Sequence, residues 1–319
     1  MRFDLCAELA SLQACPTASV LPSGLASGFV DGCTTWFVRG EMDANTKSGN
    51  QKKNNARECY QKRAAAGTLQ LPSELNLDPD SGAPPLKDWV AIEINFKLLS
   101  AWYSTDDRPF HVLDNPVRKD RVFGVPYMSA ASWKGLLRWA CRMQAGLQEH
   151  LQRHGGKMDD WRDPDWIVHL FGNEKGEKED FRRGALAFYP TWFNKVGFEV
   201  INPHSRKTRA GTQPILYEVV PADTEGVLRL LYAPLPGGGV REAVERIDAI
   251  QKLLDAAEQL LTVYGFSAKR TAGWGIAEVT GARANGGQWQ RENPFQELKG
   301  KIPALLGSRV DKALASRMG

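Results

Sequence analysis

The carboxylate of Asp114 precedes a run of cationic residues and is the group in this chain best suited to do chemistry. Asn115 and Pro116 follow it, and a proline pushes the residue before it into an extended conformation, so we expect Asp114 on a loop. An ionised aspartate could orient or deprotonate a ribose 2′-hydroxyl, or bind a divalent ion that does so. Either step would allow Asp114 to take part in RNA cleavage. Spacing alone favours a simpler role, in which Asp114 caps a turn or pairs with a cation.

Two groups of cations follow Asp114. The first lies in the loop directly after it and could stabilise charge on a scissile phosphate: Arg118, Lys119 and Arg121. The second follows Ser129, a predicted N-cap, and recurs every fourth residue along a predicted amphipathic helix: Lys134, Arg138 and Arg142. These side chains would lie about 6 Å apart per turn, near the spacing of phosphates on a single strand. Any solvated helix face carries such residues, so that explanation stays open.

Two further basic loops are candidates for phosphate binding. The loop Gly265 to Gly275 places Lys269 and Arg270 between glycines, which permit the close approach of a phosphate. The loop Asn202 to Arg209 offers three more cations: Arg206, Lys207 and Arg209. An ordinary connector and a solvent-facing charge run are the respective alternatives.

The histidines are weaker candidates. His150 and His154 lie four residues apart and could bind a metal with a third ligand, although a polar helix end is the preferred interpretation. His111 lies just before the aspartate and could act as a general acid or base. His169 lies in an apolar run that predicts a core position, and His204 belongs to a basic loop.

Hydrophobic periodicity predicts the elements that must position these residues. They are a strand in WVAIEINFKLL, a helix over Ala130 to His154, a strand in GALAFYPTWF, a long strand interrupted near Pro221, a helix over Val240 to Val263, and a strand in GWGIAEVTG. The order βαββαβ is that of an α+β, ferredoxin-like (RRM-like) fold, in which two helices cover one face of an antiparallel sheet. The other face would be free to bind a nucleic-acid strand.

This core is expected over residues 88–282, with an N-terminal extension over 1–87 and a C-terminal tail over 283–319. The extension contains the polar, basic segment Asn45 to Arg63, which predicts a mobile loop that could become ordered on RNA.

Composition sets broad limits. The 319 residues carry a formal charge of only +4, so a nucleic-acid surface must come from local clustering. The five cysteines include no CxxC pair, which argues against a disulfide scaffold and a zinc ribbon. No apolar run approaches the roughly 20 residues that span a bilayer, and no signal peptide is evident. We therefore expect a cytoplasmic protein without membrane contact.

The motifs resemble those of a known family. The run LDNPVRKD…VPYMSAASWKGLLR is similar to the signature of the RAMP superfamily of CRISPR-associated proteins, specifically the repeated backbone subunit of type III effector complexes. In that pattern an aspartate, a small or polar residue, a proline, a basic residue and an acid precede a P-x-x-P-G-S-S-x-K-G-x-x-R helix start. LFGN, SRKTRAGTQPILYEVVP and GFSAKRTAGWGIAEV resemble later landmarks in the right order, so the resemblance covers about residues 89–280.

The resemblance implies roles for matching positions. Asp114 matches the aspartate that cuts target RNA at regular intervals in catalytically active members, and Ser132, Lys134 and Arg138 match residues that hold guide RNA. In two respects the chain departs from the pattern: Ser129-Ala130-Ala131 replaces the usual proline-glycine-serine, and the N-terminal extension has no counterpart in the short family pattern.

The resemblance therefore implies a guide-RNA-binding subunit of a type III CRISPR ribonucleoprotein that holds crRNA and cleaves complementary target RNA through Asp114. Its partners would be other effector subunits, and Mg²⁺ or another divalent cation would act transiently in cleavage, with no resident metal site. Two alternatives stay open. One is a non-catalytic RNA-binding assembly subunit, and the other is a stand-alone guide-processing endoribonuclease.

Overall fold

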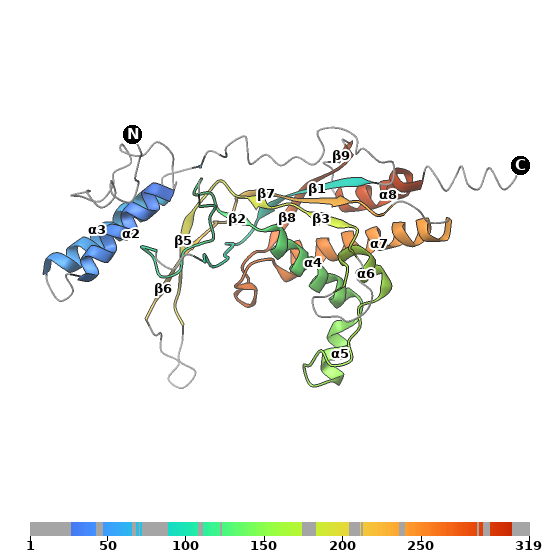
Figure 1. Ribbon diagram of the computed structural model, residues 1–319, viewed down its shortest axis with the longest axis horizontal. Helices are drawn as coiled ribbons and strands as arrows, with labels where there is room; N and C mark the ends of the chain where they lie inside the picture. The colour runs from blue at the N-terminus through green and yellow to red at the C-terminus, as the bar shows by residue number, and fades with distance from the viewer. Residues whose placement is uncertain are drawn as a thin grey trace, which may run out of the picture.

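A five-stranded antiparallel sheet forms the centre of the structure (Figure 1), a computed structural model. It describes residues 27–42, 47–65, 68–69, 71, 89–107, 111–121, 123–173, 183–203, 211, 213–235, 240–285, 287–289 and 294–307. The strands lie side by side in the order β3 (Leu186–Phe188), β7 (Glu225–Tyr232), β1 (Val90–Leu98), β8 (Ala277–Ala284) and β9 (Gly287–Trp289). Each neighbouring pair is antiparallel.

β1 is the central strand, and its alternating sequence explains its place. Ile92, Ile94 and Phe96 are fully buried in the main core, whereas Glu93 between them belongs to the opposite face. Two cross-strand arginines donate to its carboxylate there, Arg229 of β7 from Nε at 2.7 Å and Arg283 of β8 from Nε at 2.9 Å. The polar residue in this strand therefore ties it to both of its neighbours.

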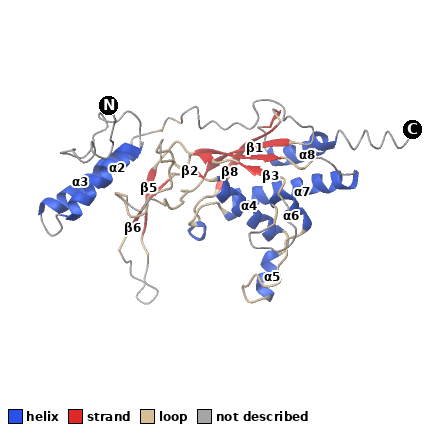
Figure 2. Cartoon of the chain, viewed as in Figure 1, coloured by secondary structure: helices blue, strands red, loops and turns tan. Residues whose placement is uncertain are grey.

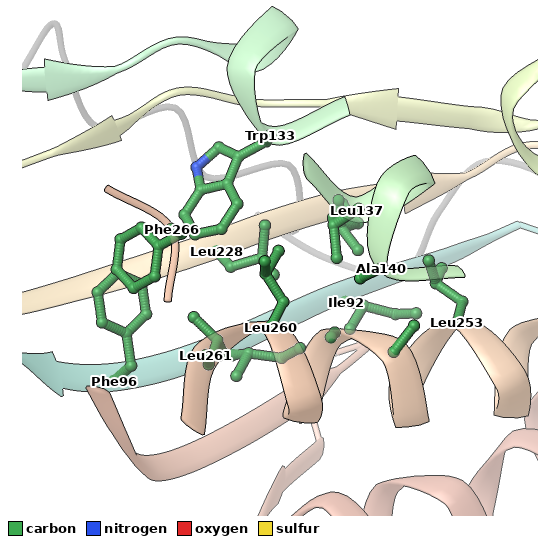
Figure 3. Packing of buried hydrophobic residues seen from close by; sticks show 14 of the residues in the cluster. Ile92, Phe96, Trp133, Leu137, Ala140, Leu228, Leu253, Leu260, Leu261 and Phe266 are labelled. Atoms are coloured by element: carbon green, nitrogen blue, oxygen red, sulfur yellow. The ribbon is translucent and has the colours of Figure 1, made fainter. Parts of the chain in front are cut away.

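Two helices pack on one face of the sheet, α4 (Ala130–Gln144) and α7 (Val240–Gln259). Trp133, Leu137 and Ala140 of α4 recur at helical spacing and meet the apolar face of β1, as Figure 3 shows. Leu253 of α7 and Leu260 of the following π-helical turn, η2 (Leu260–Tyr264), belong to the same core. Trp133 also stacks on Phe266, with ring centroids 5.0 Å apart.

The α+β class is confirmed, and the sheet and helices follow one another as β1, α4, β3, β7, α7 and β8, which is the predicted βαββαβ order. Short elements are inserted between them: β2 (Tyr127–Met128), α5 (Leu147–Arg153), α6 (Asp165–Phe171), β4 (Thr191–Trp192) and η3 (Arg270–Ala272). The helix predicted over Ala130 to His154 is broken at Gly146, whose φ of 96° is unfavourable for other residues.

The long predicted strand is interrupted near Pro221, as expected. Its first part, β6 (Ile215–Val219), leaves the main sheet and pairs with β5 (Gly197–Ile201) in a separate two-stranded ribbon. Figure 1 shows this ribbon beside the helices of the N-terminal segment. The strand predicted in GALAFYPTWF is also divided, because β3 pairs with β7 and β4 pairs with β2.

The prediction of a mobile loop over Asn45 to Arg63 is wrong. Its described residues, 47–63, lie in α3 (Lys47–Ala64), which forms a helical hairpin with α2 (Ser27–Met42) at one end of the structure (Figure 2). Ala56, Tyr60 and Ala64 recur every fourth residue and form a narrow buried stripe in an otherwise polar helix. The stripe packs with residues of α2, of the β5–β6 ribbon and of the bent segment at residues 112–115, here called the Asp114 loop. Tertiary packing therefore stabilises a helix that composition alone does not indicate.

The predicted C-terminal tail also contains structure. α8 (Pro294–Gly307) contributes Phe295, Leu298 and Ile302 to the main core, where it packs against α7 and β8. Among the described residues, no helix is both long enough and apolar enough to cross a bilayer.

Candidate nucleic-acid interface

Asp114 lies in a bent loop between β1 and α4, and its side chain is 80% exposed. The residue after it is held by β6. Asn115 Nδ2 donates to the carbonyl of Leu216 at 3.1 Å, and the backbone N–H of Glu218 donates to the carbonyl of Asn115 at 3.0 Å. The predicted loop position of Asp114 is confirmed, and the ribbon fixes the backbone beside the exposed carboxylate.

The carboxylate of Asp114 meets the guanidinium of Arg57, which comes from α3. Arg57 Nη2 lies 3.2 Å from Oδ1 and 3.3 Å from Oδ2 of Asp114, and Nε donates to the carbonyl of Val112 at 3.4 Å. The same guanidinium lies 4.9 Å from the ring centroid of Phe37. Nothing in the sequence indicated this pairing, because 57 positions separate the two charged residues.

Two of the three cations that follow the aspartate reach the surface. Arg118 is half-buried, and its Nε donates to the carbonyl of Thr105 at 3.3 Å. Arg121 is exposed, and its Nη2 lies 3.3 Å from Oδ1 of Asp107. Contact of Arg118 and Arg121 with RNA stays a prediction.

Lys119 differs from these neighbours because its side chain is only 3% exposed. Its ammonium pairs with the fully buried carboxylate of Glu218 and donates to the carbonyl of Val117 at 3.2 Å. Glu218 also accepts a 2.6 Å hydrogen bond from the Tyr60 hydroxyl and a 3.0 Å hydrogen bond from the Val117 backbone. The predicted contact of Lys119 with RNA does not fit this position, because a phosphate could reach the ammonium only by breaking a buried ion pair.

The start of α4 is open to solvent. Ser129 is the N-cap, as predicted, and its hydroxyl accepts a 3.1 Å hydrogen bond from the backbone N–H of Ser132. Lys134 is exposed, and a Cβ atom added at Gly135 would find no other atom within 4 Å. The positive end of the helix dipole favours an anion at this place.

The predicted stripe of cations along α4 is divided. Arg138 donates to Asp163 Oδ2 from Nε at 2.8 Å and from Nη2 at 2.6 Å, while Arg142 donates from Nε to Oδ1 at 2.6 Å and from Nη2 to Oδ2 at 2.8 Å. The indole Nε1–H of Trp161 also donates to Asp163 Oδ1, at 2.9 Å. Asp163 thus fixes both arginines in a partly buried cluster, whereas Lys134 remains exposed for a phosphate.

Asp163 makes the stability of the fold sensitive to acid. Burial acts to raise the pKa of its carboxyl, but hydrogen bonds from Arg142, Trp161 and Arg138 outweigh burial and lower that pKa. A lowered pKa in the folded state contributes stability above the unfolded pKa of about 4, and this contribution is lost as the pH falls through the folded pKa.

We therefore expect Asp163→Asn to lower the free energy of unfolding at pH 7, with a difference from wild type that shrinks as the pH falls below about 4. Urea unfolding of both proteins at a series of pH values measures this difference. Asp248→Asn is a matched control, because Asp248 is an exposed acid on α7 that pairs with Lys252 four residues away. If Asp163→Asn lowers the free energy of unfolding equally at neutral and acidic pH, the ionised carboxylate of Asp163 is not the source of this stability.

The glycine-rich loop between α7 and β8 is fixed by its backbone. Gly275 has a φ of 82°, and an added Cβ would lie 2.5 Å from the backbone nitrogen of Ser267. The Ser267 hydroxyl, in turn, donates to the carbonyl of Tyr103 at 3.1 Å and lies 2.9 Å from the Tyr103 backbone nitrogen. The loop therefore needs glycine at position 275 and is anchored to the segment that follows β1.

The two cations of this loop are directed to different sides. Lys269 Nζ lies 5.0 Å from the ring centroid of Tyr217 in β6, and Arg270 Cζ lies 4.4 Å from the ring centroid of Trp139 in α4. Each cation therefore has a fixed aromatic neighbour. β6 contacts both this loop, through Tyr217, and the Asp114 loop.

A pocket of about 380 Å³ lies between the start of α4 and the glycine-rich loop. Its lining includes residues from both sides: Ser132, Gly135 and Leu136 of α4, and Ser267, Ala268 and Arg270 of the loop. The fold thus brings together two predicted site residues, Ser132 and Arg270, that are far apart in the sequence. Arg206, Lys207 and Arg209 lie outside the described residues.

The described residues do not form a resident metal site. No three His, Cys, Asp or Glu side chains come together there in an arrangement that could hold a metal ion. Asp114 offers one carboxylate, which already faces Arg57, whereas Mg²⁺ takes six oxygen ligands. An ion recruited during cleavage would need RNA phosphates and water for its remaining ligands.

The histidines in the described residues have structural contacts. His150 and His154 stack with ring centroids 4.0 Å apart, and their ring nitrogens bind backbone carbonyls near the end of α5. His169 Nε2 lies 2.8 Å from the Tyr232 hydroxyl, and burial followed by the charge of Arg246 lowers the pKa of His169. His150 and His154 therefore lie at a polar helix end, and His169 is partly buried with a hydrogen-bond partner. Both positions agree with the interpretation from the sequence.

Comparison with solved structures gives three similar chains. The first belongs to a cryo-EM structure of the Type III-B Cmr-beta bound to cognate target RNA, with 14% identity, a TM-score of 0.49, and coverage of 78% of this chain and 81% of that chain. The second belongs to a CRISPR RNA-guided surveillance complex, pre-nicking, with 15% identity, a TM-score of 0.41, and coverage of 61% and 75%. The third belongs to a Csm3-Csm4 subcomplex in the type III-A CRISPR-Cas interference complex, with 15% identity, a TM-score of 0.41, and coverage of 69% and 98%.

No curated protein sequence matches the chain. The family model of the RAMP superfamily matches residues 33–278. The match begins inside α2 and ends within β8, so it includes most of the helical hairpin, the Asp114 loop, α4 and the glycine-rich loop. Because the family model covers most of its length, the chain belongs to the RAMP superfamily.

Proposed function

We propose that this chain is a guide-RNA-binding subunit of a type III CRISPR ribonucleoprotein, and that it holds crRNA and cleaves complementary target RNA through Asp114. Membership of the RAMP superfamily supports this proposal, as does the resemblance of its motifs to those of type III backbone subunits. Its partners are crRNA, target RNA and other subunits of the effector complex.

The pocket between α4 and the glycine-rich loop is the observation that carries the RNA-binding part. Ser132 and Arg270 both line it, and the open first turn of α4 adds the positive end of the helix dipole. A hydroxyl, a guanidinium and a helix start are the groups that proteins commonly use to bind a phosphate of a nucleic-acid backbone. Exposed Lys134 extends this basic surface along the helix.

The exposed carboxylate of Asp114 supports the cleavage part. In the proposed step Asp114 accepts the proton of a ribose 2′-hydroxyl, the 2′-oxygen attacks the adjacent phosphorus, and the bond to the 5′-oxygen of the next nucleotide breaks as that oxygen takes up a proton. The products are a 2′,3′-cyclic phosphate and a 5′-hydroxyl. Arg118 and Arg121, which follow Asp114 in the sequence, would stabilise charge on the phosphate. Transient participation of Mg²⁺ or another divalent cation in this step stays a prediction.

RNA binding through the pocket predicts a change in salt dependence. Lys134→Ala and Arg270→Ala should each weaken RNA binding regardless of base sequence and reduce the slope of log K against log [salt] by about 0.7, the value for one phosphate contact on a single strand. Fluorescence anisotropy over a range of salt concentrations measures the slope. Lys252→Ala on α7 is the control, since this lysine already pairs with Asp248 and contacts the Trp166 ring. Slopes equal to wild type for both variants would contradict phosphate binding here.

A non-catalytic RNA-binding assembly subunit is the second candidate. The observation in its favour is the ion pair between Arg57 and Asp114, which gives the carboxylate a partner within the protein. The experiment that separates the two candidates is cleavage of guide-complementary RNA by the assembled complex, with wild type compared with Asp114→Ala.

A further inference from the structure

The guanidinium of Arg57 is held in place by contacts that do not involve Asp114. Its Nε donates to the carbonyl of Val112, and its Cζ lies over the ring of Phe37, 4.9 Å from the ring centroid. Arg57 is therefore organised by α2 and by the backbone of the loop, and it meets Asp114 as a cation whose position is already set. The carboxylate in turn receives Nη2 at nearly equal distances from both oxygens.

The helix that carries Arg57 is fixed at the neighbouring turn. Tyr60 follows Arg57 by three residues and lies on the adjacent turn of α3, where its fully buried hydroxyl donates to Glu218. The Tyr60 ring also makes an edge contact with His111, with centroids 5.2 Å apart. Because Glu218 binds the backbone of the Asp114 loop as well, α3 and this loop share one buried anchor.

The ion pair itself contributes little to stability. The Asp114 side chain is 80% exposed and that of Arg57 is 39% exposed, and exposed ion pairs contribute little to stability because water screens their attraction. The buried residues around Tyr60 can hold α3 without it. The position of the pair is better explained by an effect on the carboxylate than by an effect on the fold.

We propose that Arg57 is a positioning residue for Asp114, and that the α2–α3 hairpin is consequently part of the site. Arg57 restrains the carboxylate at the surface in one orientation, so that an oxygen is presented to RNA without a search through rotamers. This inference rests on the proposed function, because it assigns a role in the same cleavage step.

The test uses the assembled complex with guide RNA and measures the single-turnover cleavage rate at saturating target. Arg57→Ala is expected to lower this rate on the order of tenfold to a hundredfold, as misplacement of a reacting group does, while target binding stays the same. Arg57→Lys should give an intermediate rate, because lysine keeps the charge but loses the planar fork and its second contact. If Arg57 only stabilised the fold, Arg57→Ala would not lower the cleavage rate while leaving target binding unchanged. Nor would Arg57→Lys restore part of the cleavage rate.

Lys53→Ala is the matched control. Lys53 lies four residues before Arg57 on α3 and pairs with Glu41 of α2 at 3.1 Å, so the variant removes a cation from the same helix without touching Asp114. The control should cleave like wild type, and thermal unfolding should show that both variants are folded.

The outcomes separate this inference from the proposed function. If Asp114→Ala loses cleavage while Arg57→Ala cleaves at or above the wild-type rate, the positioning role of Arg57 is overturned and the proposed function stands. If Asp114→Ala cleaves like wild type, both are overturned. If Lys53→Ala lowers the rate as much as Arg57→Ala, the effect belongs to the charge of the helix and the inference is again overturned.

Discussion

Asp114→Ala is expected to remove the regularly spaced products of target RNA cleavage while leaving guide and target binding intact. General-base catalysis typically contributes about 10² to 10⁴ in rate, so we expect a loss of that order. The exposure of the side chain makes this variant informative, because truncation at an 80% exposed position leaves no cavity in the core. The measurement is a cleavage time course of the assembled complex with labelled, guide-complementary RNA.

Asp248→Ala is the matched control for this experiment. Asp248 is also an exposed acid whose carboxylate pairs with a cation, Lys252, but it lies on α7 and not in the loop that carries Asp114. The two variants make the same change in net charge, and neither Asp248 nor Lys252 has a role in the proposed cleavage step. Equal cleavage by Asp114→Ala and Asp248→Ala would assign this chain to assembly and RNA binding, with the nuclease elsewhere in the complex.

Glu218→Ala is expected to lower the free energy of unfolding by about 3–5 kcal/mol, the cost of leaving a buried charge without its partner. The variant would strand the ammonium of Lys119, which is 3% exposed, and would also remove the acceptor of the Tyr60 hydroxyl. Urea unfolding measures the loss. We also expect increased proteolysis between α3 and the core, because this carboxylate joins the two.

A double variant tests the physical reason for that loss. Glu218→Gln combined with Lys119→Met removes both charges but keeps the volume, and such replacements are often neutral or stabilising. The double variant should therefore be more stable than Glu218→Ala. If instead Glu218→Ala unfolds like wild type, the buried ion pair does not hold the Asp114 loop and the ribbon together.

The core was predictable because its apolar residues follow simple periods. The alternation around Ile92 and Ile94 predicted β1, and the spacing of Trp133 and Leu137 predicted α4. The interruption near Pro221 was also predictable, since proline removes a backbone donor from a strand. These signals are local, and each depends on residues within a few positions of one another.

The charged contacts were not predictable, because they depend on pairs of residues distant in sequence. Arg138 and Asp163 are 25 positions apart, and a cation on an amphipathic helix looks the same whether it faces solvent or a buried acid. Glu218 offered one signal, a lone acid among apolar residues in ILYEVV, which indicates a buried partner without naming it. The contact of Arg57 was not predictable either, because the narrow buried stripe around Tyr60 is too weak a signal to predict the helix that carries Arg57.

The hydrogen bond between Tyr60 and Glu218 has a consequence for synthesis on the ribosome. The two residues are separated by 158 positions, which at translation rates of about 5–20 residues per second corresponds to roughly 8–30 s. During that interval the nascent α3 has its tyrosine but not the acid that anchors it. The Asp114 loop is translated within the same interval, so it can reach its final shape only after the ribbon has emerged. The candidate site is therefore assembled late, from segments made early.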